Sequence, residues 1–360
     1  MMGSSETLPE ELGWIITKTP KWLEKWDRIQ KSHPLGMFTQ TSSWLSSYQA
    51  YGFDFELLIK VDKAGEILSG FGNLIVKIGP LKAYVCPWGP FVSESGDLRE
   101  ALDHFLNRAK KLNCFAAQFN LGGYDTPSDI PARMEMIGWK KGNILGKIYS
   151  PKSFNIINLP SLEEDYKGIL FAHFEGKAKR NIKTGLKFPV EITSAKDENE
   201  VRQAYQMFEE NAQRESYSIR SWKDIGPSMT DSVLKGNSVV FLAKFENEVV
   251  AAIWLAIGGN MFTYIMGGSD KSQKKLNLGF LLQWAAVCKS VEMGFDRYNI
   301  STGGSPGVMD FKMSFNPKEI YSPGSFLKIV NPTTFWMFEK GYRIAERNKS
   351  LAAKILKLIK

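Results

Sequence analysis

The residues best suited to do chemistry lie in the stretch from Asn299 to Phe315, which reads NISTGGSPGVMDFKMSF. Its glycines, Gly307 among them, let the backbone approach a ligand closely, because glycine has no Cβ and tolerates positive φ. Lys312 follows Phe311 in an apolar context. If such a site excludes water, one fixed ammonium stabilises developing negative charge far better than it would in bulk solvent. The alternative interpretation is an ordinary loop whose lysine faces solvent.

A second candidate is the segment 176–187, GKAKRNIKTGLK, which contains five basic residues and no acidic one. We expect a helix over 171–186, and its spacing places positions 179, 183 and 187 on one face. Lys179, Arg180 and Lys183 are therefore candidate contacts for a phosphate-bearing partner. A solvated helix face explains the same pattern equally well.

A third candidate is the cluster that contains Arg214, Tyr217 and Arg220. Arginine offers a planar fork for carboxylate or phosphate, and a nearby tyrosine adds a hydrogen bond. Paired charges on a helix surface are the alternative. Tyr264 ends a predicted strand, and the segment after it opens a helix, as at the donor site of acetyltransferase-type folds. The glycine-rich loop that holds a pyrophosphate is absent there, which counts against coenzyme A.

Several chemistries have no support in the sequence. The only histidines are His33, His104 and His173, and no GxSxG motif accompanies them, so a serine or cysteine hydrolase is disfavoured. No pair of residues has metal-ligand spacing, and neither a Walker loop nor GxGxxG is present. We therefore expect no metal and no resident cofactor.

Composition describes an ordinary soluble protein that reads as cytoplasmic. The 360 residues carry a net charge of +8, which suits a phosphate-rich partner without proving one. Three scattered cysteines favour a reducing compartment over a disulfide framework. The first residues lack the apolar core of a secretion signal, and no apolar run is long enough to span a bilayer.

The elements that must position these residues occur in the same order twice. In each half the pattern predicts two helices, an antiparallel meander of three strands, an amphipathic helix and a strand. In the first half these are helices over 19–32 and about 41–52, strands within 55–91, a helix over 98–112 and a strand near 114–121. In the second half they are helices over 198–214 and 222–234, strands within 238–268, a helix over 278–293 and a strand near 294–301. The fold class is therefore α/β, with two similar domains built on mixed, largely antiparallel sheets.

Taken together, these segments resemble a known protein family. FTQTSSW, YVCPWGPFV, KAKRNIKTGLK, FEENAQRESYSIR, YIMGGSD and GFDRYNISTGGSPGVMDFKMSFNP occur in this order, which is similar to the Fem (FemABX) aminoacyltransferases. The most specific elements are Gly307 to Lys312 and Trp88 to Pro90. The resemblance covers nearly the whole chain. It implies two tandem acetyltransferase-like (GNAT) domains, residues 1–155 with about 325–360, and 156–324, with a C-terminal helix that returns to the first.

The resemblance also implies roles for the candidate residues. Lys312 would stabilise the tetrahedral oxyanion, and Phe311 would shape the site for the tRNA acceptor end. Arg214 and Arg220 would bind the anionic precursor, and Arg180 and Lys183 would contact phosphate or tRNA. Tyr264 would line the channel.

The function implied is transfer of an amino acid from aminoacyl-tRNA to an amine of a peptidoglycan precursor, UDP-linked or lipid-linked, in cell wall biogenesis. Two alternatives stay open. One is an N-acyltransferase of the same fold that uses acyl-CoA or another thioester. The other is a non-catalytic protein that binds tRNA or the inner membrane surface through the basic C-terminal helix 333–360. The sequence leaves the oligomeric state undetermined.

Overall fold

The computed structural model describes residues 13–93, 96–122, 130–144, 151–163 and 165–347. Contacts divide the chain into two units: unit 1 consists of Met1–Ile29, Thr39–Ser150 and Pro323–Lys360, and unit 2 of Gln30–Phe38 and Pro151–Ser322. The segment Gln30–Phe38, which belongs to unit 2 although its chain neighbours belong to unit 1, has no counterpart in the predicted domain division. It is held there by backbone hydrogen bonds from Gly259 N to Gln30 O at 2.9 Å and from Asn260 N to Lys31 O at 2.7 Å.

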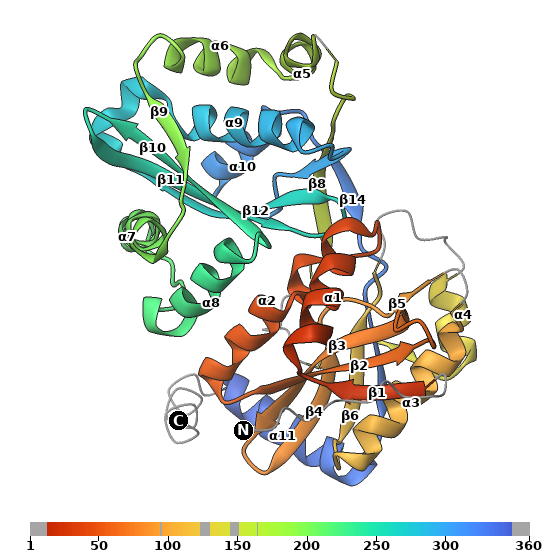
Figure 1. Cartoon of the computed structure of the whole chain (residues 1–360). Helices are drawn as coiled ribbons and strands as arrows, with labels where there is room; N and C mark the ends of the chain where they lie inside the picture. The colour runs from red at the N-terminus through yellow and green to blue at the C-terminus, as the bar shows by residue number, and fades with distance from the viewer. Residues whose placement is uncertain (1–12, 94–95, 123–129, 145–150, 164, 348–360) are drawn as a thin grey trace, which may run out of the picture. The chain divides into compact units, whose positions relative to one another are not determined.

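Unit 1 contains a mixed sheet in the order β1-β2-β3-β4-β6-β15-β7, with β5 paired to β3 (Figure 1). Among the described strands of unit 1, only β4 and β6 pair in parallel; the other pairs are antiparallel. The strands are β1 (Gly13–Thr17), β2 (Asp54–Val61), β3 (Ile67–Ile78), β4 (Leu81–Cys86), β5 (Phe91–Val92), β6 (Ala116–Asn120), β7 (Lys140–Lys141) and β15 (Ser325–Ile329).

Helices cover both faces of this sheet because successive strand residues point to opposite faces. Leu57 and Ile59 of β2 belong to a core with α1, α2 and α11, whereas Leu58 belongs to a second core with α3 and α4. The helices are α1 (Pro20–Ser32), η1 (Phe38–Gln40), α2 (Ser42–Ser46), η2 (Ser47–Tyr51), α3 (Leu98–Lys111), α4 (Ile130–Met136) and α11 (Pro332–Arg347).

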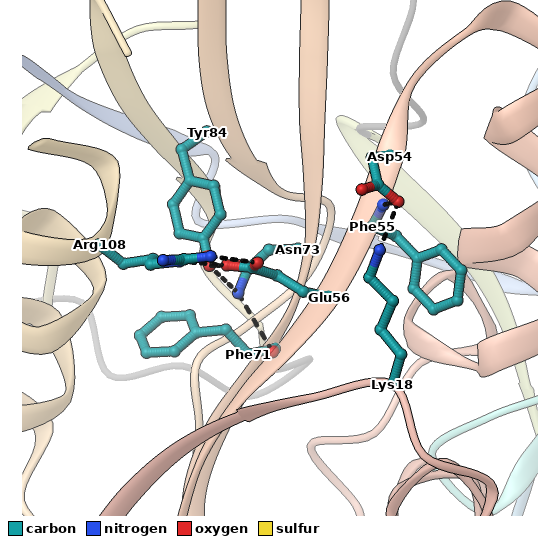
Figure 2. Close-up of polar contacts among 8 residues, drawn as sticks. All are labelled: Lys18, Asp54, Phe55, Glu56, Phe71, Asn73, Tyr84 and Arg108. Carbon is teal, nitrogen blue, oxygen red and sulfur yellow. Dashed lines mark hydrogen bonds and ion pairs between the residues drawn. The ribbon is translucent and has the colours of Figure 1, made fainter. Parts of the chain in front are cut away.

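A buried polar network lies under α3 (Figure 2). The Arg108 guanidinium donates two hydrogen bonds of 2.8 Å to the Glu56 carboxylate. Tyr84 Oη donates to the same carboxylate, and Asn73 Nδ2 donates to Tyr84 Oη, both at 2.8 Å. Burial and the Glu56 charge raise the pKa of Tyr84 well above its ordinary value. Burying a carboxylate is tolerated here because its oxygens are paired.

Unit 2 contains a second mixed sheet, in the order β14-β8-β13-β12-β11-β10-β9. The one parallel pair that the described residues form in this sheet is β12 with β13; the others are antiparallel. The strands are β8 (Ser153–Asn158), β9 (Glu191–Ser194), β10 (Ser238–Phe245), β11 (Glu248–Ile257), β12 (Met261–Ser269), β13 (Arg297–Asn299) and β14 (Lys318–Tyr321).

The helices of unit 2 lie on both sides of its sheet, with α5, α6 and α9 on one side and α7 and α8 on the other (Figure 1). The main core gathers Leu170, Ile182 and Leu282 from the first three helices against Ile253 and Leu255 of β11. The helices are α5 (Tyr166–His173), α6 (Gly176–Gly185), α7 (Glu198–Arg214), α8 (Trp222–Leu234), η3 (Lys271–Leu276), α9 (Leu278–Glu292) and α10 (Pro306–Met313).

The repeat predicted from the sequence is present. Two helices, three antiparallel strands, a helix and a parallel strand run α1-α2-β2-β3-β4-α3-β6 in unit 1 and α7-α8-β10-β11-β12-α9-β13 in unit 2. Two strands are exchanged between the halves of the repeat. β8 follows β7 in the chain but lies between β13 and β14 of the unit 2 sheet, and β15 follows β14 in the chain but lies between β6 and β7 of the unit 1 sheet. The predicted α/β fold class, with mixed, largely antiparallel sheets, is confirmed.

One predicted element is wrong. The helix expected over 171–186 is two helices, α5 and α6, because Phe174 and Glu175 are extended, with ψ of 157° and 162°. Glu175 N donates to Ser314 O at 3.0 Å, a tertiary bond that the local pattern does not reveal. Lys187 lies beyond the end of α6, so it does not share a helical face with Lys179 and Lys183.

Candidate functional site

The candidate site begins where the two parallel strands of unit 2 separate. β12 and β13 pair only from Met261 to Thr263, and β12 then continues to Ser269. A bulge at Ile265 interrupts its pairing with β11, since Leu255 pairs with Tyr264 and Trp254 with Met266. A bulge re-aims the side chains beside it. Past Thr263, no strand in the described part of the chain continues the β13 side of β12.

The chain after β13 turns toward β8 instead. Ile300 N donates to Asn155 O at 3.0 Å, and Asn155 Nδ2 donates to Ser301 O at 3.2 Å. Ser301, Gly303 and Gly304 have φ of 61°, 86° and 126°. This left-handed backbone is easy for glycine and strained for serine, and it folds the chain tightly before α10 begins.

Lys312, near the end of α10, returns its side chain to the gap between the separated strands. The residue is only 4% exposed. Its ammonium donates to Ser301 Oγ at 2.9 Å and to Gly303 O at 3.0 Å, and it lies 5.4 Å from the centre of the Tyr264 ring. Burial lowers the pKa of Lys312 to about 8. Among the described residues, no carboxylate forms an ion pair with it.

This arrangement leaves the ammonium one N–H group to offer. An ammonium has three donors, and two of them are taken by Ser301 and Gly303. A fixed cation donor beside a strand gap fits a transition state in which oxygen gains negative charge. At pH 7 the group is mostly protonated, because its pKa of about 8 still lies above the ambient pH.

Tyr264 forms the wall of the gap on the β12 side. Burial raises its pKa above the ordinary value, with a smaller contribution from the nearby Tyr217 phenol. Its hydroxyl occupies space next to Gly267, where a Cβ would lie 2.7 Å from Tyr264 Oη. Gly267 is therefore needed for the position of the Tyr264 ring.

Arg214 and Tyr217 meet at the C-terminal end of α7, close to the end of β12. Arg214 Nη2 donates to Asn211 Oδ1 at 2.6 Å and to Ser269 O at 3.3 Å, and Asn211 Nδ2 donates to Tyr217 Oη at 2.9 Å. The structure thus places two predicted site residues, Arg214 and Tyr217, beside β12, the strand that carries a third, Tyr264.

Arg220 lies farther along, between α7 and α8. Its carbonyl oxygen accepts a hydrogen bond from the Tyr205 hydroxyl, and its Nη2 lies 3.5 Å from Asp224 O. These contacts belong to the packing of α7 against α8. A role for Arg220 in binding substrate stays a prediction.

Phe311 and Lys312 are adjacent in sequence but face different surroundings. The Phe311 ring packs edge-on against Phe280 of α9, with centroids 4.8 Å apart, and against Phe315 at 5.5 Å. Consecutive helical residues diverge by about 100°, so one side chain fills the aromatic core while the other enters the gap. A Cβ on Gly307 would meet nothing within 4 Å, so local packing does not require glycine there.

The basic residues of α6 have separate local partners. Lys179 Nζ donates to Ala172 O at 2.8 Å, and Lys183 Nζ lies 5.3 Å from the centre of the Phe171 ring. Arg180 is exposed. Lys177 pairs with Asp310, which ties α6 to α10, the helix that carries Lys312.

The corresponding place in unit 1 is closed. Beyond the parallel pair of β4 and β6, Gly89 N donates to Asn120 O at 2.8 Å and Asn120 Nδ2 donates to Pro87 O at 2.7 Å. The buried Trp88 indole rests on Gly122, where a Cβ would lie 2.7 Å from its Nε1. The Trp88 to Pro90 element singled out in the sequence therefore lies beyond the parallel pair of unit 1, at the place that corresponds to the strand gap of unit 2.

Sequence reasoning missed Ser301, Gly303 as an acceptor, and Asn211. A serine directly after a short apolar strand and before a glycine run was the available signal for Ser301. For Gly303 the relevant atom is a backbone oxygen, which no residue type reveals. Among the described residues no cluster of histidine, cysteine, aspartate or glutamate could hold a metal ion.

Residues 172–313 match the family model described as "Acetyltransferase (GNAT) domain". Unit 2 contains a GNAT acyltransferase domain. The matched residues run from the end of α5 to the end of α10, so this GNAT domain includes the strand gap and Lys312. The chain thus carries the domain of an acyltransferase, as the sequence predicted.

About nine tenths of the chain is similar in fold to several solved structures. FemX matches with a TM-score of 0.74 at 16% identity, over 90% of this chain and 99% of that one. L-PGS from Bacillus licheniformis matches with 0.53 at 12%, over 92% and 97%. The C-terminal domain of a putative lysylphosphatidylglycerol synthetase from Agrobacterium fabrum matches with 0.53 at 12%, over 90% and 96%. No curated protein matches the sequence. The resemblance to the Fem proteins is confirmed at the level of the fold.

Proposed function

We propose that unit 2 transfers an aminoacyl group from aminoacyl-tRNA to an amine of a peptidoglycan precursor. The observation that carries this proposal is the Lys312 ammonium, fixed between Ser301 Oγ and Gly303 O in the gap where β12 and β13 separate. The fold likeness to FemX supports an aminoacyl donor, because the Fem proteins that the sequence resembles use one.

The proposed reaction is attack of the acceptor amine on the ester carbonyl of the donor. A C–N bond forms, the C–O bond to the tRNA ribose breaks, and the amine proton passes to the departing oxygen. The third N–H group of Lys312 stabilises the oxyanion of the tetrahedral intermediate. Proximity supplies much of the remaining acceleration, since both substrates are held in one gap. An ester donor is already activated, so the proposal requires no metal and no resident cofactor.

The other candidate residues take binding roles in this proposal. Arg180 and Lys183 on α6 would meet the phosphates of the donor tRNA, with Lys179 beside them. Arg214 and Tyr217 would hold an anionic group of the precursor, because Arg214 contacts the end of β12 and Tyr217 lies close enough to Tyr264 to raise its pKa. Such a reaction belongs to cell wall biogenesis on the cytoplasmic side. Among the described residues, no helix is long and apolar enough to cross a membrane.

Transfer of radiolabel from a pool of charged tRNAs to UDP-linked and lipid-linked peptidoglycan precursors tests the proposal. The decisive variant is Lys312→Met, and its matched control is Lys318→Met, an exposed lysine six residues away in the same unit. We expect label transfer by the parent chain and by Lys318→Met. Loss of one oxyanion donor lowers kcat by about 10²- to 10³-fold, so Lys312→Met should be nearly inactive. Full activity of a folded Lys312→Met variant would exclude the proposed role of the ammonium.

A thioester donor is the second candidate, and one observation favours it. Asn277 opens α9 in the left-handed region, with φ of 51° and ψ of 40°, and Gly279 follows two residues later. A left-handed residue at a helix start turns backbone N–H groups toward an anion such as a pyrophosphate. Label transfer from acyl-CoA in place of charged tRNA, still dependent on Lys312, would support this alternative.

A further inference from the structure

The last described helix, α11, is anchored to unit 1 by one side only. Phe335 and Phe338 pack on the core between the sheet and α1. The Phe338 ring stacks on Phe115 of the sheet side, with centroids 4.8 Å apart. This aromatic contact fixes the helix and determines which of its residues face away from the unit.

The opposite side of α11 presents large apolar and basic side chains. Trp336 is 59% exposed and Met337 is 52% exposed. Lys340 and Arg343 are also exposed and follow Trp336 at helical spacings of four and seven residues. The Lys340 ammonium lies 5.8 Å from the centre of the Trp336 ring, which places the cation and the indole together. We call these four residues the α11 surface.

Charge is concentrated in this part of the chain. Residues 332–360 contain seven lysines and arginines against two glutamates, so they carry five of the eight excess positive charges. Four of the lysines are at positions 349, 354, 357 and 360, outside the described residues, in a segment without acidic residues. An anionic partner is favoured by this imbalance.

We propose that the α11 surface binds a bilayer of anionic lipids. Tryptophan prefers the boundary between headgroups and hydrocarbon, and an exposed methionine enters the same layer. Lysine and arginine beside them meet the negatively charged headgroups, with their alkyl chains lying along the apolar layer. A folded RNA would use the basic residues but would gain little from burying Met337. The helix lies on the bilayer and does not span it.

One consequence rests on the proposed function. A protein held on an anionic bilayer meets a lipid-linked acceptor at high local concentration, so the acceptor class that fits this surface is the lipid-linked precursor. The bilayer binding itself is independent of the reaction, because every residue of the α11 surface belongs to unit 1 and Lys312 belongs to unit 2.

Co-sedimentation of the full chain with vesicles tests the proposal. We expect binding to vesicles of phosphatidylcholine with phosphatidylglycerol, and little binding to phosphatidylcholine alone. Each basic residue near an anionic surface changes affinity by about 5-fold. Lys340→Glu/Arg343→Glu should therefore weaken binding at least ~20-fold, and Trp336→Ser/Met337→Ser should weaken it as well. In addition, brominated lipid should quench tryptophan fluorescence less in Trp336→Phe than in the parent chain.

Matched controls keep these outcomes specific. Lys110→Glu/Lys111→Glu reverses two exposed lysines on α3 of the same unit, and Met136→Ser removes a methionine that is 85% exposed on α4. Both should bind vesicles as the parent does, and so should the inactive Lys312→Met. Vesicle binding that ignores phosphatidylglycerol, or that survives both α11 double variants, would overturn the proposal. Loss of tRNA binding instead of vesicle binding in those variants would assign the surface to RNA.

Discussion

The Lys312 ammonium and the Ser301 hydroxyl lie 2.9 Å apart, and Ser301 has a φ of 61°. Serine occupies this left-handed position at some conformational cost, where glycine would be at ease. Its hydroxyl is the side-chain group that fixes the direction of the ammonium. In the proposed reaction Lys312 would be the catalytic cation, and Ser301 would be the residue that positions it.

Replacing Ser301 should therefore affect turnover more than folding. Ser301→Gly removes the hydroxyl and suits the backbone, so we expect thermal stability to be kept while kcat for transfer falls roughly 10-fold, the value of one hydrogen bond to a charged group. KM for both substrates should change little. Ser305→Gly, an exposed loop serine whose side chain makes no capping bond, is the control. A change in KM with unchanged kcat would show that Ser301 acts on binding instead.

The depressed pKa of Lys312 predicts a pH limit on activity. In the proposed reaction only the charged form of Lys312 would stabilise the oxyanion, so kcat should fall as the pH rises through about 8. Lys312→Arg keeps its charge at every accessible pH, so whatever activity it retains should lack this alkaline limb. Measuring kcat of the parent chain and of Lys312→Arg from pH 6 to 10 tests this difference. An alkaline limb that persists unchanged in Lys312→Arg would assign the titration to another group.

The same pKa predicts a linked change in stability. Because the pKa of Lys312 is lower in the folded state, about 8, than the ordinary 10.5, the unfolded chain binds more protons between these values. The contribution of Lys312 to the free energy of unfolding is therefore lowest below pH 8 and rises with pH up to about 10.5. Relative to Lys312→Met, the parent chain should gain up to about 3 kcal/mol over that window, at 1.36 kcal/mol per unit. Urea unfolding of both chains at pH 7 and pH 10 measures it; equal differences at the two pH values would contradict it.

The sequence predicts several helices and the position of Lys312, and the features that it does not predict have physical causes. The spacing of apolar residues predicts α7 and α8 to the residue, because both are amphipathic and the Asp197 side chain caps the start of α7. Lys312 stands out by its apolar neighbours. By contrast, the break between α5 and α6 depends on Ser314, and the insertion of β15 depends on β6 and β7. These are contacts between distant segments, which a local pattern does not encode.

Arg214 offers a test of acceptor binding. Arg214→Ala should raise KM for the peptidoglycan precursor about 10-fold or more, since a charge-assisted contact is lost, with a smaller effect on kcat. Arg202 lies on the same helix, with its guanidinium carbon 4.9 Å from the centre of the Trp222 ring. Arg202→Ala is therefore the control for the loss of an arginine from α7. Steady-state kinetics with varied precursor measure both. Equal effects of the two variants would argue against a specific role for Arg214.

The exposed cations of α6 should act on the donor. Arg180→Glu/Lys183→Glu is expected to raise KM for charged tRNA. It should also reduce the slope of log affinity against log salt concentration by about two, because two phosphate contacts are lost. The variant leaves the Lys177–Asp310 pair intact. Lys140→Glu/Lys141→Glu, on the exposed β7 of unit 1, supplies the same change of charge elsewhere. If the two double variants weaken donor binding equally, net charge and not the α6 position is responsible.

The network in unit 1 predicts an asymmetric response to mutation (Figure 2). Glu56 is almost fully buried against Arg108, so Glu56→Leu leaves an uncompensated cation and should destabilise the chain by about 3–5 kcal/mol. Glu56→Leu with Arg108→Met removes both charges and should cost much less. Denaturant unfolding of the two variants tests this. A double variant as unstable as the single one would show that packing, not charge pairing, dominates.

The exchange of β8 and β15 between the two sheets bears on how the chain is made. The sheet of unit 1 lacks its strand between β6 and β7 until residues 325–329 have been synthesised, after the last residue of unit 2. A gene cut between Ser150 and Pro151, where the two units divide, would therefore separate β15 from the rest of the unit 1 sheet, whereas β8 would stay with its own sheet. We therefore expect unit 1, although it begins first in the chain, to complete its sheet only after unit 2 has been synthesised.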